Sequence, residues 1–106
     1  MTEITPKELK DRIDKGEDVF VLDVREEWEY EESNIGMKLF PLGEIPIRLD
    51  ELEPRREQEI IVHCKTGKRG NQARKFLISR GFTNVRNLEG GIEAYLSLNQ
   101  EPKAGE

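Results

Sequence analysis

The 106-residue chain has only one cysteine and one histidine, and both scarcities exclude kinds of protein. A single thiol cannot form an internal disulfide, which fits a reducing compartment. Without a Cys-x-x-Cys pair, a structural zinc site is not expected. No apolar run approaches membrane-spanning length, and the first residues lack the basic-then-apolar order of a signal peptide. We therefore expect a cytoplasmic protein without a membrane segment: one domain over residues 1–98 and a polar, flexible tail over residues 99–106.

Acidic residues are missing from one long window around the cysteine. The window from Lys65 to Leu88 contains no Asp or Glu, and its basic residues are Lys65, Lys68, Arg69, Arg74, Lys75, Arg80 and Arg86. It carries +7 and the rest of the chain −12, for a net charge of −5. This pattern predicts attraction of a small anion to the thiol, although Arg74, Lys75 and Arg80 fit a solvated helix face better. Nucleic acid is not expected as a partner, because no aromatic residues interleave with the bases.

Apolar runs alternating with helical patterns indicate an α/β fold. Residues 19–24 and 59–63 predict strands buried on both faces, and residues 3–4, 37–40 and 84–88 predict shorter ones. Helical patterns cover residues 6–13, 26–32, 45–52, 68–80 and 92–96. The first helix has Thr5 as N-cap, Pro6 at its first position and Glu8 placed to close a capping box. Such an alternation predicts a parallel sheet covered by helices.

Polar residues follow both buried strands. Asp23 and Arg25 end the first, and His63 and Cys64 end the second. In a parallel sheet the carboxyl ends of the strands meet at one edge, where ligands bind. Asp23 and Arg25 fit a supporting role at this edge about as well as a local capping role.

The stretch after Cys64 favours a reactive thiol over an inert buried one. Lys65–Thr–Gly–Lys–Arg69 combines cations with a glycine, and a helix start follows. Gly67 allows the loop to curl so that N–H groups converge on one point, and unpaired N–H groups at a helix start favour an anion. The thiolate is the nucleophilic form of cysteine, and such surroundings stabilise it.

Two residues near this loop are weaker candidates for a role in catalysis or ligand binding. His63 precedes Cys64 in a strand, so its side chain should point to the opposite face, which favours packing over general-base catalysis. Trp28 fits packing better than a ligand platform.

Three stretches resemble the rhodanese family of single-domain sulfurtransferases. Cys64–Lys–Thr–Gly–Lys–Arg69 resembles the family's active-site loop, and Asp23–Val–Arg–Glu26 its Asp-Val-Arg-Glu motif. Asn87–Leu–Glu–Gly–Gly–Ile92 resembles its closing Leu-x-Gly-Gly segment. The three occur in family order and span most of the chain. The resemblance implies a rhodanese-like three-layer domain, in which a five-stranded, mostly parallel sheet has helices on both faces.

The resemblance also implies roles. Cys64 would take a sulfane sulfur from a donor such as thiosulfate, become a persulfide and pass the sulfur to a nucleophilic acceptor. Asp23 and Arg25 would support the site, and no metal or organic cofactor is required. The loop that binds the donor and cradles the outer sulfur would consist of Lys65, Thr66, Gly67, Lys68 and Arg69.

The length of the loop separates sulfur from phosphate chemistry. Four residues lie between Cys64 and Arg69, whereas the related phosphatases use one more, so a phosphatase or arsenate reductase is a distant third hypothesis. The chain also departs from the family pattern. Gly70 stands where many members have Ser, which removes a hydroxyl that could cap the helix, and Ser33–Asn–Ile35 stands where many have Gly-His-Ile.

Two hypotheses from different classes remain. The first is a sulfurtransferase that takes a small sulfur-containing anion such as thiosulfate. The second is a module that carries a persulfide or docks a donor or acceptor protein without efficient turnover, in sulfur-carrier, cofactor or tRNA thiolation pathways. Residues 33–46 favour the second, because they resemble domains fused to enzymes that adenylate sulfur-carrier proteins.

Overall fold

A five-stranded parallel sheet forms the centre of the protein. The computed structural model describes residues 2–98; the predicted tail, residues 99–106, lies outside this range. Sheet order is β1-β5-β4-β2-β3, and every pairing is parallel. The predicted α/β fold and its five strands are confirmed. The strands are β1 (Glu3–Ile4), β2 (Val21–Asp23), β3 (Lys38–Leu39), β4 (Ile60–His63) and β5 (Val85–Leu88).

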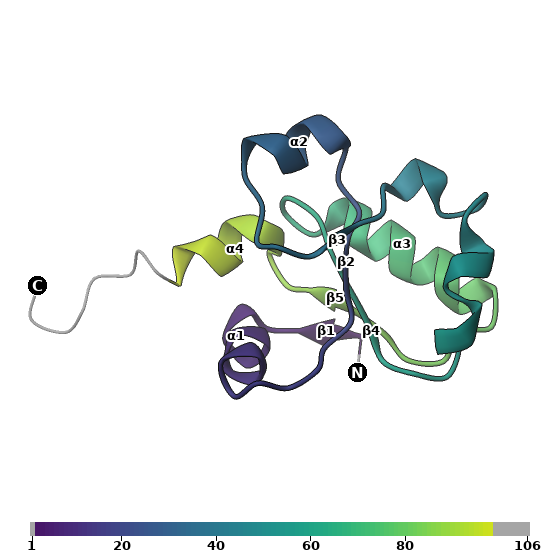
Figure 1. Cartoon of the computed structure of the whole chain (residues 1–106), viewed down its shortest axis with the longest axis horizontal. Coiled ribbons are helices and arrows are strands. Elements are labelled where there is room, and N and C mark those ends of the chain that lie inside the picture. Colours follow the sequence, from purple (N-terminus) through teal and green to yellow (C-terminus); the bar gives the residue numbers. More distant parts are fainter. Residues whose placement is uncertain (1, 99–106) are drawn as a thin grey trace, which may run out of the picture.

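Helices cover both faces of this sheet. On one face α1 (Pro6–Asp14) contacts α4 (Gly91–Ser97). On the other face lie α3 (Lys68–Ser79) and the first of three short 3-10 turns. The short helix α2 (Glu27–Glu32) follows β2 and stands at the top of the molecule in Figure 1. The three layers place the carboxyl ends of β2 and β4 beneath α2.

The central strands alternate between two apolar clusters. On the α3 side, Ile60 and Val62 of β4 pack with Cys64. On the α1 and α4 side, Ile61 packs with Leu9. All of these residues are buried, as expected for strands covered on both faces. The alternation places the side chains of His63 and Cys64 on opposite faces.

The start of α1 is partly as predicted. The Thr5 hydroxyl accepts the backbone N–H of Glu8 at 3.1 Å, so the N-cap is confirmed. The predicted capping box is wrong, because the Glu8 carboxylate accepts hydrogen bonds from Arg86 of β5, at 3.1 and 3.3 Å. A long-range charged partner has replaced the local one.

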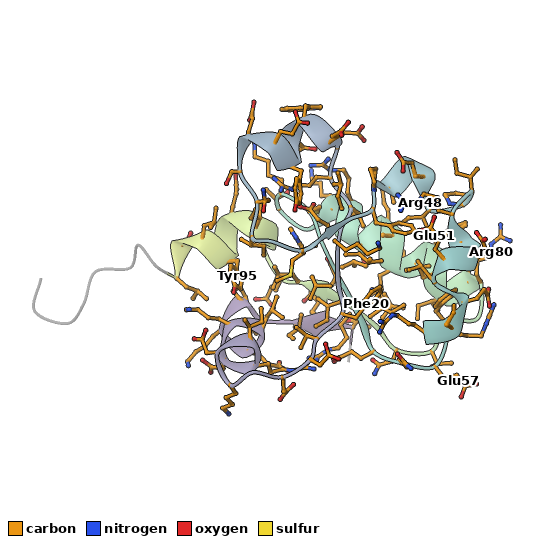
Figure 2. All side chains as sticks on the ribbon, viewed as in Figure 1. Phe20, Arg48, Glu51, Glu57, Arg80 and Tyr95 are labelled. Atoms are coloured by element: carbon orange, nitrogen blue, oxygen red, sulfur yellow. The ribbon has the colours of Figure 1, made fainter. Side chains whose placement is uncertain are left out.

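The predicted helix over residues 45–52 is wrong. The chain instead forms the 3-10 turns η1 (Leu42–Glu44), η2 (Leu49–Glu51) and η3 (Glu53–Arg55). Pro46 would lie in the first turn of that helix, where proline is tolerated, but Arg48 has φ −114° and ψ 17°, outside the helical region, and this interrupts a regular helix. Short turns bury Ile45 and Leu52 while Ile47 stays exposed. On this side, Figure 2 shows Arg48 and Glu51, whose side chains form an ion pair.

Two neighbours on α3 provide a test of the core. Leu77 is fully buried in the α3-side cluster, whereas Ile78 is 42% exposed. We expect Leu77→Ala to lower the free energy of unfolding by about 3 kcal/mol, through lost burial and a residual cavity. The matched variant Ile78→Ala should lower the free energy of unfolding by less than about 1 kcal/mol. Urea titrations of both variants measure the difference, and equal losses would contradict this packing.

Candidate active site

Cys64 lies in the connection between β4 and α3. It directly follows β4, and α3 begins four residues later at Lys68. Its side chain is only 1% exposed and packs in the α3-side cluster. The predicted place of the thiol, between the carboxyl end of a buried strand and the start of a helix, is therefore what the structure shows.

Two backbone N–H groups point at the sulfur. Gly67 donates to Cys64 Sγ at 3.1 Å, and Gly70 donates to it at 3.2 Å. Gly67 has φ +120°, a conformation that residues with a side chain rarely adopt. This conformation allows the chain to change direction between the loop and the first residue of α3. Gly70 belongs to the first turn of α3, whose N–H groups have no intrahelical acceptor. The arrangement stabilises negative charge on the sulfur.

Helix α4 holds the same loop from the outside. Ile92 donates its backbone N–H to the carbonyl of Cys64 at 2.8 Å, and Glu93 donates to that of Lys65 at 3.2 Å. A Cβ on Gly91 would overlap both carbonyls, so only glycine allows this approach. In a trans peptide the C=O and the N–H point in opposite directions. The N–H groups of Lys65 and Thr66 therefore point away from α4.

Asn87 on β5 holds the end of the loop. Its side-chain Nδ2 donates to the carbonyl of Gly67 at 3.0 Å, and the residue is only 3% exposed. A Cβ on Gly70 would overlap Asn87 Oδ1. Glycine at position 70 is thus matched to asparagine at position 87. The sequence analysis did not predict this support. The one signal for it in the sequence was Gly70, a glycine inside a predicted helix.

Arg69 is held by an ion pair with α2. Its guanidinium donates to both oxygens of Glu29, at 2.6 and 2.9 Å. The hydrogen bonds from Arg69 lower the pKa of Glu29 to about 2, so the carboxylate remains charged over the ordinary pH range. Glu29 also accepts the N–H of Glu26 at the start of α2. The loop arginine therefore fastens α2 above the site.

The other loop side chains face solvent. Lys65, Thr66 and Lys68 are exposed. Lys65 Nζ lies 4.0 Å from a carboxylate oxygen of Glu93 on α4. Of the predicted loop, Gly67 contacts the sulfur through its backbone and Arg69 contacts α2.

Asp23 and Arg25 form a buried pair at the edge of the site. Arg25 donates to both carboxylate oxygens of Asp23, at 2.9 and 2.8 Å, and to the carbonyl of Ser33 at 2.9 Å. These hydrogen bonds with Asp23 raise the pKa of Arg25 despite its burial. The pair joins the end of β2 to the segment after α2, as a support would, and does not touch Cys64 Sγ through a hydrogen bond.

His63 lies on the other side of the sheet from the thiol. It is fully buried, and its Nε2 is 3.6 Å from Asp23 Oδ2. Neither ring nitrogen has a hydrogen-bond partner within the described chain. Burial lowers the pKa of His63, a shift only partly opposed by the charge of Asp23. These contacts agree with the predicted packing role.

A groove lies between α2 and α4, next to Lys65. Its volume is about 210 Å³. Trp28 on its wall is 62% exposed, so the predicted packing role of Trp28 is wrong. The six-residue helix α2 contains no buried residue and does not reach the sheet with this side chain. The residues of this α2–α4 groove are Arg25, Trp28, Glu29, Glu32, Ser33, Lys65, Ile92, Glu93 and Leu96.

Membrane-spanning helices and clusters of metal-binding side chains are both absent from residues 2–98. No helix in this range is long and apolar enough to cross a membrane. In the same range, His, Cys, Asp and Glu nowhere gather in groups of three or more that could hold a metal ion.

Fold and site together define a small α/β domain that presents one cysteine sulfur to converging backbone N–H groups. The model of the rhodanese-like domain matches residues 5–98. The chain belongs to the rhodanese-like family.

Relatives of known name support the same assignment. A protein from Allochromatium vinosum named sulfurtransferase is 33% identical over 96 residues, which cover 90% of this chain and 88% of that protein. YrkF from Bacillus subtilis, named as a proposed sulfur carrier protein, is 36% identical over 91 residues; these cover 85% of this chain but 48% of YrkF, about half its length. The structure of the human single-domain sulfurtransferase TSTD1 superposes with a TM-score of 0.77 at 26% identity, covering 92% of this chain and 96% of that one.

The contact between Gly70 and Asn87 can be tested by a double-mutant cycle. We expect Gly70→Ala to lower the free energy of unfolding by about 1–3 kcal/mol, because its Cβ displaces the Asn87 amide from Gly67. In an Asn87→Ala background the same substitution should be neutral or favourable by up to about 1 kcal/mol, since alanine suits a helix better. Urea titrations measure the coupling, and an equal cost in both backgrounds would refute the matched pair.

His63 should make stability depend on pH. Its pKa is lowered in the folded state, so the unfolded chain binds the proton more readily as the pH falls below about 6.5. The free energy of unfolding should therefore decrease from pH 7 to pH 5.5, with a slope of at most about 1.4 kcal/mol per pH unit. His63→Gln should remove that slope, because the chain has no other histidine. A wild-type protein with constant stability over this range would contradict the prediction.

Proposed function

We propose that the protein is a sulfurtransferase that moves a sulfane sulfur through a persulfide on Cys64. Support comes from one observation above all: the N–H groups of Gly67 and Gly70 converge on Cys64 Sγ. These N–H groups stabilise negative charge on the sulfur. The folded unit that carries this activity is residues 1–98, and its proposed location is the cytoplasm.

The transfer has two displacement steps. In the first, the Cys64 thiolate attacks the outer sulfur of a donor such as thiosulfate. A Cys64–sulfur bond forms, the donor's S–S bond breaks, and sulfite leaves with the electron pair. In the second, a nucleophilic acceptor such as cyanide or a thiolate attacks the outer sulfur, and the electron pair returns to Cys64 as a thiolate. Charge is conserved in both steps.

The loop offers further N–H groups to the transferred sulfur. Those of Lys65 and Thr66 point away from α4, since α4 holds the carbonyls of Cys64 and Lys65. The N–H of Lys68 belongs to the same peptide unit as the Gly67 carbonyl and points in the opposite direction. That carbonyl accepts hydrogen bonds from Asn87 Nδ2 and from the backbone N–H of Asn71. We assign the N–H groups of Lys65, Thr66 and Lys68, with that of Arg69, to the outer sulfur. Asp23 and Arg25 support the edge of the site.

A second candidate is a persulfide-carrying or protein-docking module without efficient turnover. The likeness to YrkF, with its name of a proposed sulfur carrier protein, favours it. The exposed Trp28 beside the site also suits a protein surface. Multiple-turnover release of thiocyanate from thiosulfate and cyanide separates the two candidates. A carrier would load one sulfur and stop.

Intact-mass measurement tests the shared chemistry. After treatment with thiosulfate or a low-mass persulfide, the wild-type protein should gain the mass of one sulfur atom, and a reductant should remove it. Cys64→Ser should gain none, because its hydroxyl is a far weaker nucleophile. Lys75→Ala, on an exposed part of α3, is the matched control and should load like the wild type. A wild-type protein that gains no sulfur from any donor would refute the proposal.

A further inference from the structure

Most of the basic window does not reach the site. Arg86 lies on β5 and binds Glu8 and Glu59, whose hydrogen-bonded oxygens are 3.1 and 3.2 Å away. The guanidinium of Arg80 stacks 4.9 Å from the ring of Phe76, near the end of α3. Arg74 donates to Asn71 Oδ1 at 3.2 Å within α3, and Lys75 is exposed on the same helix. The remaining cations belong to the loop after Cys64: Lys65, Lys68 and Arg69. The +7 window therefore overstates the positive charge that a ligand meets.

Carboxylates neutralise two of these three cations. Arg69 is paired with Glu29, and Lys65 lies 4.0 Å from Glu93. Arg25, the other cation on the α2–α4 groove, is paired with the buried Asp23. Glu32 also lines the groove and has no cation within 4 Å among residues 2–98. These pairs leave Glu32 as the uncompensated charge among the groove residues, so the groove itself carries a net negative charge. Lys68 is the one cation of the neighbouring loop, residues 65–69, that opposes Glu32.

The surroundings of the groove add to this charge. Helix α2 and its N-cap contain Glu26, Glu27 and Glu31 in addition to the two groove glutamates, and no base. Lys68 alone opposes them from the loop. Within a Debye length of about 8 Å, such a cluster repels a dianion and attracts a cation.

The apolar part of the groove suits an organic group. The exposed ring of Trp28 stands on one wall, and Ile92 and Leu96 of α4 stand on the other. Thiosulfate has no apolar part that could use these side chains. An aromatic ring beside carboxylates is, in contrast, a favourable environment for a cationic group.

We infer that the preferred sulfur donor is a thiol persulfide, R–S–SH, whose organic group R is uncharged or cationic, rather than the thiosulfate dianion. This inference rests on the proposed function and names the donor class for the same site. The Cys64 thiolate attacks the outer sulfur of the donor, a Cys64–sulfur bond forms, and the donor's S–S bond breaks. The thiolate R–S⁻ leaves with the electron pair, and the proton remains on the transferred sulfur. No dianion enters or leaves the groove.

A series of donors that differ in charge tests the inference. The probes are the persulfides of cysteamine, 2-mercaptoethanol and 3-mercaptopropionate, with R groups of similar size and charges of +1, 0 and −1, together with thiosulfate. Each rate constant for sulfur loading of Cys64 is divided by the rate of the same donor with a free low-mass thiol. We expect this ratio to fall from the cationic to the anionic donor and to be lowest for thiosulfate.

Charge variants of the groove provide the decisive comparison. Glu32→Gln with Glu93→Gln should raise the ratio for thiosulfate and for the anionic persulfide roughly three- to tenfold and lower that of the cationic one, because two repelling charges are removed. Glu57→Gln is the matched control and should leave all ratios unchanged. Glu57 is exposed and lies at the far end of the molecule from α2 and α4 in Figure 2.

A peptide arm separates low-mass from protein-borne donors. A cysteine-persulfide peptide with flanking lysines should load Cys64 faster than the same peptide with flanking glutamates. A ratio well above that of cysteamine persulfide would indicate a protein-borne donor, and an equal ratio a low-mass one. Equal rates for the two peptides would contradict the inference.

The two proposals fail in different ways. If Cys64 is loaded but the ratios do not depend on donor charge, or thiosulfate is preferred, the donor class is wrong and the sulfurtransferase proposal stands. If no donor loads Cys64 in the wild type or in Glu57→Gln, the proposed function itself is wrong.

Discussion

The site depends on how the carbonyl groups of the loop after β4 are held. Each peptide unit is planar, so an outward carbonyl forces the attached N–H inward. Helix α4 holds the carbonyls of Cys64 and Lys65, and Asn87 holds that of Gly67. The hydrogen bonds of Gly67 and Gly70 to Cys64 Sγ are one consequence. The site is thus built mainly from backbone dipoles, and side chains from two other elements keep those dipoles aligned.

Electrostatic pairing then determines which charges remain free near the sulfur. Arg69 would be the natural anion-binding side chain of the loop, but both of its hydrogen bonds to Glu29 hold it against α2. Because the pKa of Glu29 is lowered to about 2, this pair persists at any pH at which the protein is expected to be folded. A cation engaged in this way shapes the entrance more than it attracts an anion. The charge of a sequence window and the charge of a surface are therefore different quantities.

Much of the architecture could be predicted from the sequence. The apolar runs around β2 and β4 indicated buried parallel strands, and Thr5 and Pro6 indicated the start of α1. Cys64 followed by a glycine-bearing loop and a helix placed the thiol correctly. Errors arose where a long-range partner or the local backbone conformation departed from the pattern. Glu8 binds Arg86 instead of its own helix start, and the non-helical backbone at Arg48 leaves 3-10 turns where spacing alone indicated a helix.

By itself the sequence determined the fold class and the position of the nucleophilic sulfur, because the periodicity of apolar residues and the alternation of strand and helix patterns are local properties of the chain. Only the tertiary structure decided what surrounds that sulfur. Gly70 is required because Asn87, seventeen positions later, occupies the space of its side chain. Trp28 is exposed because no part of α2 is buried against the sheet, a placement that the local pattern does not report. Pairing of Arg69 with Glu29 joins residues forty positions apart, and no local pattern reports such a contact.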